Sequence, residues 1–525
     1  MFSILNKLKY YFLNKNEKLF ILSNKNKKNY VDDKKKIILI NTIYDYFFLL
    51  LTKCITNLKN DYIFIGLDPY ILPQRSNKYF IKKYISNIHG FFFNKLLKIK
   101  WNKLYYSIRV KNIINFNFVV KKDRKKNKKI YLKIIKKIKK KEDILKISLH
   151  GINFGEIIYD TYLRFGGSPT VNINDFFLRK IIFNFIIVSN NFDRFLFKNR
   201  NNIEALYTMY SSYIHHGLFV RYCYKYRIPV ISIIQHSCIG ARIKKITHKD
   251  NYSHNPLFLD YKKKFNMLKN KSYKLEQAKK ELYKRFHGNK DKALFYVKNK
   301  NFSYKKNMFK KYSEKYKNLT GVLFLHDYFD SPHTFFLKAF PDYYEWTIYT
   351  LNLIRKYKLN IAIKPHPNAT EESKKISDNI KKNYADLMWI DDQTNNLVFF
   401  SNKNFKFGIT CNGTIIQELC YFNKIPIFLS QESMSPFLNI KVPLNKEDYK
   451  SQILNYDKLH LPGNIKISVL KSYYLSNLND NGHKQFDFMK ILIQSKFYTM
   501  DPSSSKKLFY YSNQIDSQIK NSNII

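Results

Sequence analysis

The sequence predicts an α/β protein with parallel, doubly wound sheets, and three observations lead to this prediction. Short apolar runs of four or five residues alternate with longer segments of helical periodicity. Several of these runs end abruptly in polar residues, as buried parallel strands do. A chain of 525 residues is too long for one hydrophobic core, so we expect two such domains plus extensions.

The first half begins with a β-α-β unit over residues 35–70, and the pattern becomes clear again from residue 146. Residues 203–210 fit either a helix or a strand. The lysine-rich stretch 121–141 has isoleucines at helical spacing, so it either lies on an anionic membrane or is a solvated helix; the lysine-biased composition favours the solvated helix. Predicted strands are 37–40, 62–65 and 230–234, and predicted helices are 44–58, 121–141, 175–197 and 217–226.

The second half repeats strand and helix with short loops, which is typical of a parallel sheet with crossover helices. Predicted strands are 322–325, 360–363, 387–390, 407–410 and 425–429, and predicted helices are 343–357, 371–383, 394–403 and 414–422.

These patterns divide the chain into two sheet domains with extensions. Residues 261–315 are polar and lysine-rich with few apolar anchors, so we expect a helical connector there. The predicted divisions are an N-terminal extension (1–30), an N-terminal Rossmann-like domain (31–260), the connector (261–315), a C-terminal Rossmann-like domain (316–460) and a helical tail (461–525).

Two motifs of the C-terminal domain predict an anion site. Lys364 and His366 follow a predicted strand and offer a cation and a directional donor, while the flanking prolines restrict their loop. Asn412, Gly413 and Thr414 follow another strand and lead into a helix whose first N–H groups can face the same ligand.

Glu418 stands four residues after Thr414, on the same helix face and away from the apolar face, so we expect it to point at the ligand. The alternative is that the first motif is only a strand-ending turn and the second only a helix cap.

A third polar group, His326, Asp327, Asp330 and His333, follows the first strand of the C-terminal domain. Two histidines and two aspartates within eight residues would suit a metal site, but no second cluster of compatible spacing completes a ligand shell. We therefore expect no metal and assign His326, Asp327 and His333 to hydrogen bonds with a ligand.

The motifs resemble those of bacterial capsule and surface polysaccharide biosynthesis proteins, which are glycosyltransferases of the GT-B type. Lys364-Pro-His-Pro367 and Asn412-Gly-Thr-Ile-Ile-Gln-Glu418 carry the resemblance, and the His-Pro pair is similar to the one that holds cytidine nucleotides in bacterial sialyltransferases, Kdo transferases and polyglycerolphosphate polymerases. Further matching blocks are Ile157-Ile-Tyr-Asp-Thr-Tyr-Leu-Arg164, His216-Gly217 with Ile228-Pro229 and Gln235-His236, and Leu325-His-Asp-Tyr-Phe-Asp-Ser-Pro-His333.

The resemblance covers about residues 146–430 and implies two Rossmann-like domains that face a cleft, with extra helices. Ser237 stands where such proteins commonly have a glycine, which weakens any role for the Gln235-His236 loop.

In the N-terminal domain Asp160 is our candidate base, with His216 as the second catalytic candidate. A helix salt bridge between Asp160 and Arg164, four residues apart, explains the aspartate equally well. His216 precedes a glycine at a helix start and either contacts the acceptor or caps the helix. Acceptor-side candidates are Tyr159, Arg164, Gln235 and His236.

The net charge of +54 does not by itself indicate a nucleic-acid-binding protein. Only 12 of the 93 basic residues are arginine, the residue that base readout and phosphate clamping favour. Weak, salt-sensitive adhesion to polyanions, including anionic lipid, is still expected.

The five cysteines contain no C-x-x-C pair, and the sequence shows neither a continuous signal-peptide core nor a run of about 20 apolar residues. We expect a cytoplasmic protein, with contact to the inner face of the membrane left open.

The resulting hypothesis is a metal-independent glycosyltransferase without a cofactor. It would transfer a sugar from a nucleotide-activated, cytidine-linked donor to a glycan or lipid-linked acceptor. One rival is an enzyme similar to the CDP-polyol glycerophosphotransferases, which moves a phosphoryl group. Another is a non-enzymatic polyanion-binding protein, although the lysines are spread over the whole chain rather than gathered on one face.

Overall fold

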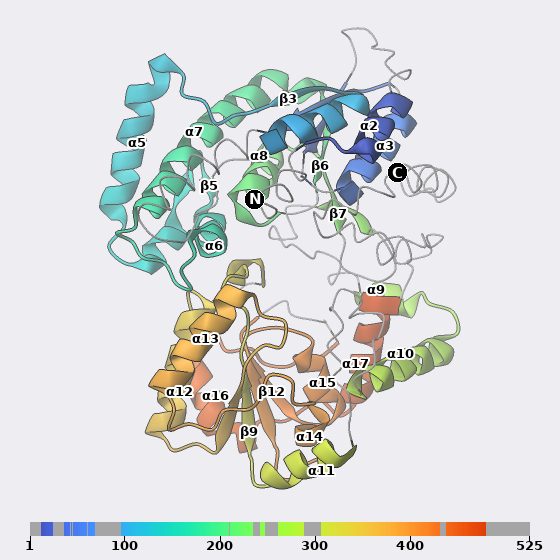
Figure 1. The fold of residues 1–525 in the computed structure, drawn as a ribbon, viewed down its shortest axis with the longest axis vertical. Coiled ribbons are helices and arrows are strands. Elements are labelled where there is room, and N and C mark those ends of the chain that lie inside the picture. The colour runs from blue at the N-terminus through green and yellow to red at the C-terminus, as the bar shows by residue number, and fades with distance from the viewer. Residues whose placement is uncertain are drawn as a thin grey trace. The chain divides into compact units, whose positions relative to one another are not determined.

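The computed structural model consists of two compact units, each described here by itself (Figure 1). Unit 1 contains the described residues up to 166 and those from 173 to 246, and unit 2 contains 167–172 and those from 261 to 478. No helix within this part of the chain is long and apolar enough to cross a membrane. The structure describes residues 12–24, 36–42, 44, 46–59, 61–68, 96–208, 211–234, 242–246, 261–287, 306–335, 337–430 and 437–478.

Unit 1 is built on a six-stranded sheet of order β3-β2-β1-β6-β7-β8, parallel except for β8. The predicted strands β1, β2 and β7 are confirmed, and the ambiguous stretch 203–210 forms β6. Strands β3 and β8 were not predicted, because lysine and asparagine interrupt their apolar residues. The bounds are β1 Ile37–Asn41, β2 Ile63–Leu67, β3 Val110–Ile114, β6 Ile203–Thr208, β7 Val230–Ile234 and β8 Arg242–Ile246.

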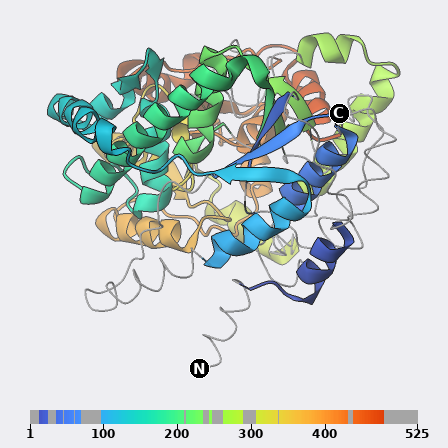
Figure 2. The same ribbon diagram turned by 90° about the horizontal axis from the view of Figure 1, so that it is seen from above.

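Helices lie on both sides of this sheet, as Figure 2 shows from above. The longest, α7, is capped at its N-terminus by Asp175, whose carboxylate accepts from the Phe177 N–H, and most of the apolar residues of α7 are buried. Main helices are α2 Lys15–Asn24, α3 Tyr46–Leu58, α5 Arg124–Lys137, α6 Gly155–Gly166, α7 Phe176–Asn199 and α8 Leu218–Lys225, with residues 96–107 also helical.

Short elements connect these helices. They are the 3₁₀-helices η2 Lys121–Asp123, η3 Lys141–Lys146 and η4 Arg200–Asn202, the hairpin of β4 Ser148–Leu149 and β5 Ile152–Asn153, and the π-helix η5 Tyr213–Gly217. The described residues 12–24 of the predicted N-terminal extension pack into unit 1. Phe20 of α2 is fully buried, and Glu17 forms a buried ion pair with Lys100 (2.7 Å).

Unit 2 contains a four-stranded parallel sheet of order β10-β9-β11-β12. Four of the five predicted strands are confirmed, and the fifth, 387–390, is reduced to a single parallel bridge between Trp389 and Ile363. The bounds are β9 Gly321–Phe324, β10 Ile361–Lys364, β11 Phe407–Thr410 and β12 Ile425–Phe428.

The four predicted helices of unit 2 are confirmed as α12 to α15, although α14 is much shorter than predicted. The bounds of the unit's helices are α9 Tyr261–Asn266, α10 Lys271–Phe286, α11 Lys306–Lys315, α12 Tyr343–Lys356, α13 Glu371–Asn383, α14 Leu397–Phe400, α15 Ile415–Tyr421, α16 Lys446–Leu454 and α17 Ile465–Tyr473, with 3₁₀-helices η8 Pro332–Phe335 and η9 Tyr456–Lys458 and the π-helix η10 Tyr474–Leu478.

The predicted doubly wound α/β class is thus confirmed in both units. The stretch expected to be a connector instead supplies part of the core of unit 2. Leu282 and Phe286 of α10 are buried in a cluster with Ile416 of α15 and Val469 of α17. Few apolar residues were enough, because they recur on one face of α10.

The core of unit 2 contains a fully buried tyrosine that is held by two polar partners. The Tyr449 hydroxyl accepts from Trp346 Nε1–H (2.8 Å) and shares a hydrogen bond with Thr350 Oγ1 (2.7 Å). Because water cannot replace a buried partner, the hydroxyl stabilises the seating of α16 against α12.

We predict that Tyr449→Phe lowers the free energy of unfolding of unit 2 by about 1–3 kcal/mol, because the Trp346 N–H is left buried without its acceptor. Urea unfolding checks the value. Tyr273→Phe, at a tyrosine that is 65% exposed, is the matched control and should leave the transition unchanged. Equal transitions for both variants would contradict the assignment.

Candidate functional site

The candidate site of unit 2 lies at the carboxyl edge of its parallel sheet, where three strands end in polar residues. His326 follows β9, Lys364 ends β10 and Asn412 follows β11. The chain passes from central β9 to β10 on one side and later to β11 on the other, so the strand order changes direction there. Ligands of open α/β sheets bind outside the carboxyl ends of strands at such a point.

Lys364 is buried, and its ammonium group already has two protein acceptors. It donates to the Thr394 carbonyl oxygen (2.7 Å) and to Asn396 Oδ1 (2.6 Å). Burial lowers the pKa of Lys364 to about 8, although the nearby Glu418 carboxylate acts in the opposite direction. An ammonium has three N–H donors, so one remains for a ligand after these two bonds.

Glu418 differs from the sequence expectation, because its carboxylate faces protein partners. Arg285 Nε–H donates to Glu418 Oε1 (2.7 Å) and Asn396 Nδ2–H donates to Glu418 Oε2 (3.2 Å). Both charged side chains are 9% exposed. Arg285 also donates to the Thr414 hydroxyl. Asn396 therefore joins Lys364 to the Arg285–Glu418 pair, and we call these four residues with Thr414 the edge network.

Arg285 and Asn396 were not among the predicted site residues. Arg285 reaches the site from α10, 133 positions before its partner Glu418. The end of α10 is also held at the Phe286 carbonyl, which accepts from Asn395 Nδ2 (3.2 Å). The available sequence signal was an arginine in a chain whose basic residues are mostly lysine, since bidentate and buried ion pairs favour the guanidinium.

His366 presents a neutral ring to the site. Burial lowers the pKa of His366 to about 4, and His326 adds to this effect. Its Nδ1 accepts from the Asn368 N–H (3.2 Å), so the ring proton of the neutral form lies on Nε2. The His326 ring lies 5.6 Å away between centroids. His366 therefore offers a ligand a hydrogen-bond donor without a charge.

Asp327 and His333 lie at the same edge but differ in accessibility. Both carboxylate oxygens of Asp327 accept hydrogen bonds from backbone groups, one from the Phe329 N–H (2.9 Å) and one from the Thr370 N–H (2.7 Å). This arrangement fastens the loop after β9 to the start of α13, so Asp327 positions the site in this structure. His333 is buried in η8. The described residues contain no group of three or more His, Cys, Asp or Glu side chains that could hold a metal ion.

The loop after β11 offers an acceptor and a sharp turn. Asn412 is 8% exposed, and its Oδ1 has no hydrogen-bond partner among the described residues. Gly413 has φ +119°, where a side chain would be strained, and an added Cβ would meet no atom within 4 Å. An unsatisfied buried acceptor beside open space is where a ligand donor would bind.

In unit 1 the structure places His216 at the carboxyl edge of the sheet. His216 Nδ1 lies 2.8 Å from Asn41 Nδ2 at the end of β1, and the same amide lies 3.3 Å from Thr208 Oγ1 at the end of β6. The amide N–H can only donate, so the neutral His216 carries its proton on Nε2. An added Cβ at Gly217 would lie 2.3 Å from the Ser211 carbonyl oxygen, so this turn requires glycine.

The other unit 1 candidates lie in or near α6. Tyr159 and Asp160 are buried, Asp160 with 1% exposure, whereas Arg164 is exposed. Burial, with a further contribution from the Arg164 charge, lowers the pKa of His215 to about 3. The Ile214 N–H donates to Thr161 Oγ1 (2.9 Å) and ties η5 to α6. Gln235 and His236 lie outside the described residues.

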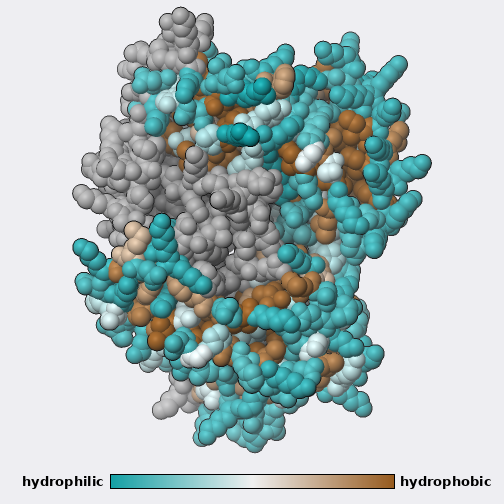
Figure 3. All heavy atoms as spheres, turned by 180° about the vertical axis from the view of Figure 1, so that it is seen from behind, coloured by the Kyte–Doolittle hydropathy of each residue, from teal (hydrophilic) through white to brown (hydrophobic). Residues whose placement is uncertain are grey.

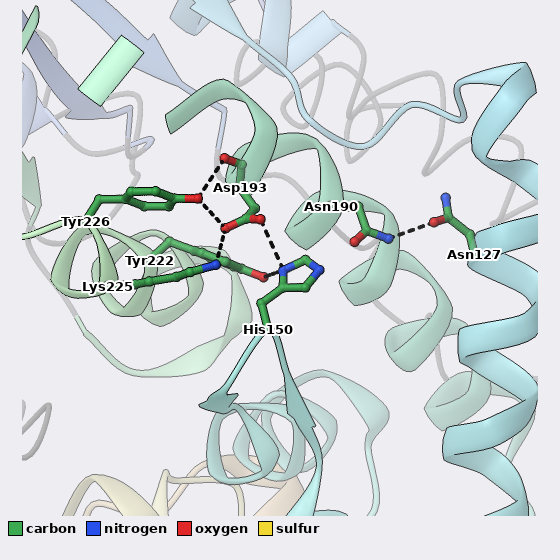
Figure 4. Close-up of polar contacts among 7 residues, drawn as sticks. All are labelled: Asn127, His150, Asn190, Asp193, Tyr222, Lys225 and Tyr226. Carbon is green, nitrogen blue, oxygen red and sulfur yellow. Dashed lines mark hydrogen bonds and ion pairs between the residues drawn. The ribbon is translucent and has the colours of Figure 1, made fainter. Parts of the chain in front are cut away.

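A second polar cluster in unit 1 was not predicted (Figure 4). His150 Nδ1 lies 2.8 Å from Tyr222 Oη and 3.5 Å from Asp193 Oδ2, and Asp193 Oδ1 also binds Lys225 (2.7 Å) and Tyr226 (2.9 Å). Burial lowers the pKa of His150, against the opposite effect of Asp193. His150 has φ +54° before Gly151, so a histidine occupies a turn position that favours Asn or Asp. The cluster fastens the β4–β5 hairpin to α7 and α8.

No protein-family model and no curated protein matches the chain, so membership of the capsule-type transferase family stays a prediction. Solved structures that match include the UDP-GlcNAc 2-epimerase of Methanocaldococcus jannaschii in complex with UDP-GlcNAc and UDP. That match is 12% identical, covers 83% of this chain and 97% of the epimerase, and has a TM-score of 0.26. The UDP-GlcNAc 2-epimerase of Neisseria meningitidis, bound to UDP-GlcNAc, is 9% identical over 91% of this chain and 99% of its own, with a TM-score of 0.22.

The edge network predicts unequal costs for removing either member of its ion pair. Glu418→Gln leaves the Arg285 and Lys364 cations without their shared carboxylate, so it should lower the free energy of unfolding of unit 2 by about 3–5 kcal/mol. Arg285→Met should cost less, because Lys364 still neutralises Glu418. Urea unfolding of both variants and of the double variant measures the coupling.

Glu314→Gln, at an exposed glutamate paired with Lys317, is the control and should leave stability unchanged. Additive effects at Arg285 and Glu418, or a larger loss for Arg285→Met, would show that the network does not share charge as described.

Proposed function

We propose that the protein is a metal-independent glycosyltransferase of capsule or surface polysaccharide biosynthesis that acts in the cytoplasm, including at the inner face of the membrane. Unit 2 would bind a nucleotide-activated sugar, with cytidine as the expected nucleoside, and unit 1 a glycan or lipid-linked acceptor. The observation that carries the proposal is the set of complementary groups at the carboxyl edge of the unit 2 sheet. They are the Lys364 cation, the His366 Nε2–H donor and Asn412 Oδ1, which has no partner within the described part of the chain.

These groups suit a nucleoside phosphate that leaves from a sugar. Charge builds up on the departing phosphate in the transition state, and a fixed cation with an aligned N–H donor stabilises it without a metal. Lys364 supplies the charge, and the neutral His366 supplies a directed hydrogen bond. Their positions are fixed before a ligand binds, because Thr394, Asn396 and Asn368 already hold them.

Asp160 remains our proposed base for the acceptor hydroxyl, and the tautomer of His216 supports this choice. Because His216 Nδ1 faces an amide donor and Nε2 carries the proton, neutral His216 has no ring nitrogen ready to accept one. A carboxylate has the required lone pairs, although the burial of Asp160 means that the hydroxyl must reach the interior of unit 1.

A phosphoryl transferase that uses a cytidine diphosphate polyol would employ the same cation and donor. The two reactions break different bonds. Glycosyl transfer leaves the phosphate on the nucleotide, whereas polyol-phosphate transfer carries a phosphate into the product. Phosphorus NMR of the product therefore separates them once the nucleotide is known. A thermal-shift screen of cytidine, uridine and guanosine nucleotides comes first, and the proposal predicts stabilisation by the cytidine set.

We predict that His366→Ala weakens binding of a cytidine nucleotide about 10- to 100-fold, the scale of one hydrogen bond to a charged group. His366→Gln keeps an N–H near the Nε2 position and should retain most of the affinity. His366→Asn keeps an acceptor near the position of Nδ1, where Asn368 donates, but has no donor near the position of Nε2. It should therefore bind as weakly as His366→Ala. Calorimetry on the three folded variants checks this order, and equal affinities would remove His366 from the ligand site.

We predict that Asp160→Asn lowers turnover about 100-fold or more and leaves nucleotide affinity unchanged, since a base acts in the transition state only. Glu156→Gln is the matched control one turn earlier on α6, where Glu156 pairs with Arg221 (3.0 Å). Turnover of Asp160→Asn equal to that of the control would exclude Asp160 as the base.

A further inference from the structure

Unit 1 exposes two large apolar side chains next to its most basic segment. Phe118 is 51% exposed and Val119 is 47% exposed, and only Val120 separates them from Lys121 and Lys122 of η2. Exposed Phe and Val side chains lack the favourable free energy that burial of such side chains usually gives. Exposed apolar side chains beside a row of lysines are the combination of residues that suits a membrane interface.

The backbone that carries this pair is fixed to α7. Asn191 is 8% exposed, and its Nδ2 donates to the carbonyl oxygens of Phe116 (2.8 Å) and Phe118 (2.8 Å). Phe116 is buried against Phe192 (5.1 Å between ring centroids). The side chain of Phe116 is therefore buried in unit 1, whereas the side chains of Phe118 and Val119 are exposed to solvent.

Residues 118–137, which we call the docking segment, contain ten cations and one acid. The acid, Asp123, is neutralised by an ion pair with Arg194. Helix α5 carries seven lysines and an arginine, all exposed, and no acid; none of the seven lysines makes an ion pair within the described residues. Like charges at this density repel one another, which costs stability unless an anionic surface neutralises them.

The apolar face of α5 is already used, so its cations face outward. Tyr131 packs edge-on against Phe183 of α7 (5.5 Å), and Asn190 Nδ2 donates to the buried Asn127 Oδ1 (2.7 Å), as Figure 4 shows. Two consecutive residues of α7 therefore hold this part of the chain, Asn191 at residues 116 and 118 and Asn190 at the first turn of α5. In Figure 3, hydrophobic residues stand among hydrophilic ones on the upper right, the flank on which α5 lies.

We propose that the docking segment binds the surface of an anionic lipid bilayer, with Phe118 and Val119 inserted among the lipids and the lysines of α5 against the headgroups. A bilayer uses both parts of the surface, since apolar side chains enter the interface while lysines attract anionic headgroups. A nucleic acid would use only the cations, and would be better matched by arginine than by lysine. The exposed Leu132 of α5 adds a third apolar group. This inference does not rest on the proposed transferase activity.

The test uses the full chain and flotation with vesicles of phosphatidylcholine alone or mixed with phosphatidylglycerol. Binding is expected only to the anionic vesicles and should weaken with salt. Lys125→Glu with Lys129→Glu should weaken it about 30-fold or more, at roughly fivefold per cation. The control Lys381→Glu with Lys382→Glu makes the same charge change on α13 and should have a much smaller effect.

Phe118→Ser with Val119→Ser separates a membrane from other polyanions. It should weaken vesicle binding roughly tenfold or more and leave heparin binding unchanged. Leu444→Ser with Ile467→Ser, at exposed apolar positions of unit 2, is its control and should bind vesicles as the wild type does. Vesicle binding that is insensitive to the Phe118 and Val119 changes would overturn the proposal and show charge adhesion alone.

A direct measurement is the emission of Phe118→Trp, compared with wild type to subtract the other three tryptophans. A blue shift with anionic vesicles, and none with heparin, is expected for a ring that enters the interface. An unchanged spectrum on bound vesicles would place residue 118 outside the bilayer and contradict the proposal.

Discussion

The candidate site of unit 2 depends on one constraint, which is that charges buried at a sheet edge must be paired. The strands bring Lys364 and the loop after β11 together, but an ammonium group there would be costly without compensation. Glu418 supplies the opposite charge and Arg285 fixes Glu418, while Asn396 accepts from Lys364 and donates to Glu418. Helix α10, the 394–396 loop and α15 are therefore joined at the same sheet edge as the candidate ligand-binding side chains.

This arrangement explains why the site can be ordered before a ligand binds. Thr394 and Asn396 orient the Lys364 ammonium group, and the Asn368 N–H orients the His366 ring through Nδ1. Less ordering of these side chains therefore remains for the binding step. The remaining acceptor, Asn412 Oδ1, and the open space above Gly413 are the unsatisfied part of the edge. Unit 1 also holds a candidate side chain in place with polar partners at strand ends. Asn41, at the end of β1, contacts both His216 and Thr208, which ends the neighbouring strand β6.

The elements of the sheet edge were predictable from the sequence, whereas the pairing of charges across them was not. Apolar runs that end in polar residues located β9, β10 and β11 within one residue, because buried parallel strands have little freedom of composition. Glu418 was expected to face a ligand, because helix periodicity shows that it is not on the apolar face but does not identify its polar partner. Its partner lies on α10, a helix that was predicted to be a connector because lysines dominate it. Strand β3 was missed for a related reason, since its exposed residues Lys111 and Asn112 interrupt the apolar pattern.

Hydrogen exchange with and without a cytidine nucleotide tests the central claim most directly. The N–H groups of Gly413, Thr414 and Ile415 have no acceptor among the described residues, so they should exchange quickly in the free protein. The claim predicts that a saturating nucleotide slows exchange in the peptides that cover 361–370 and 411–418 together, and leaves α5 unchanged. Nucleotide binding that protects neither of the two peptides would place the ligand elsewhere and contradict the assignment of this sheet edge.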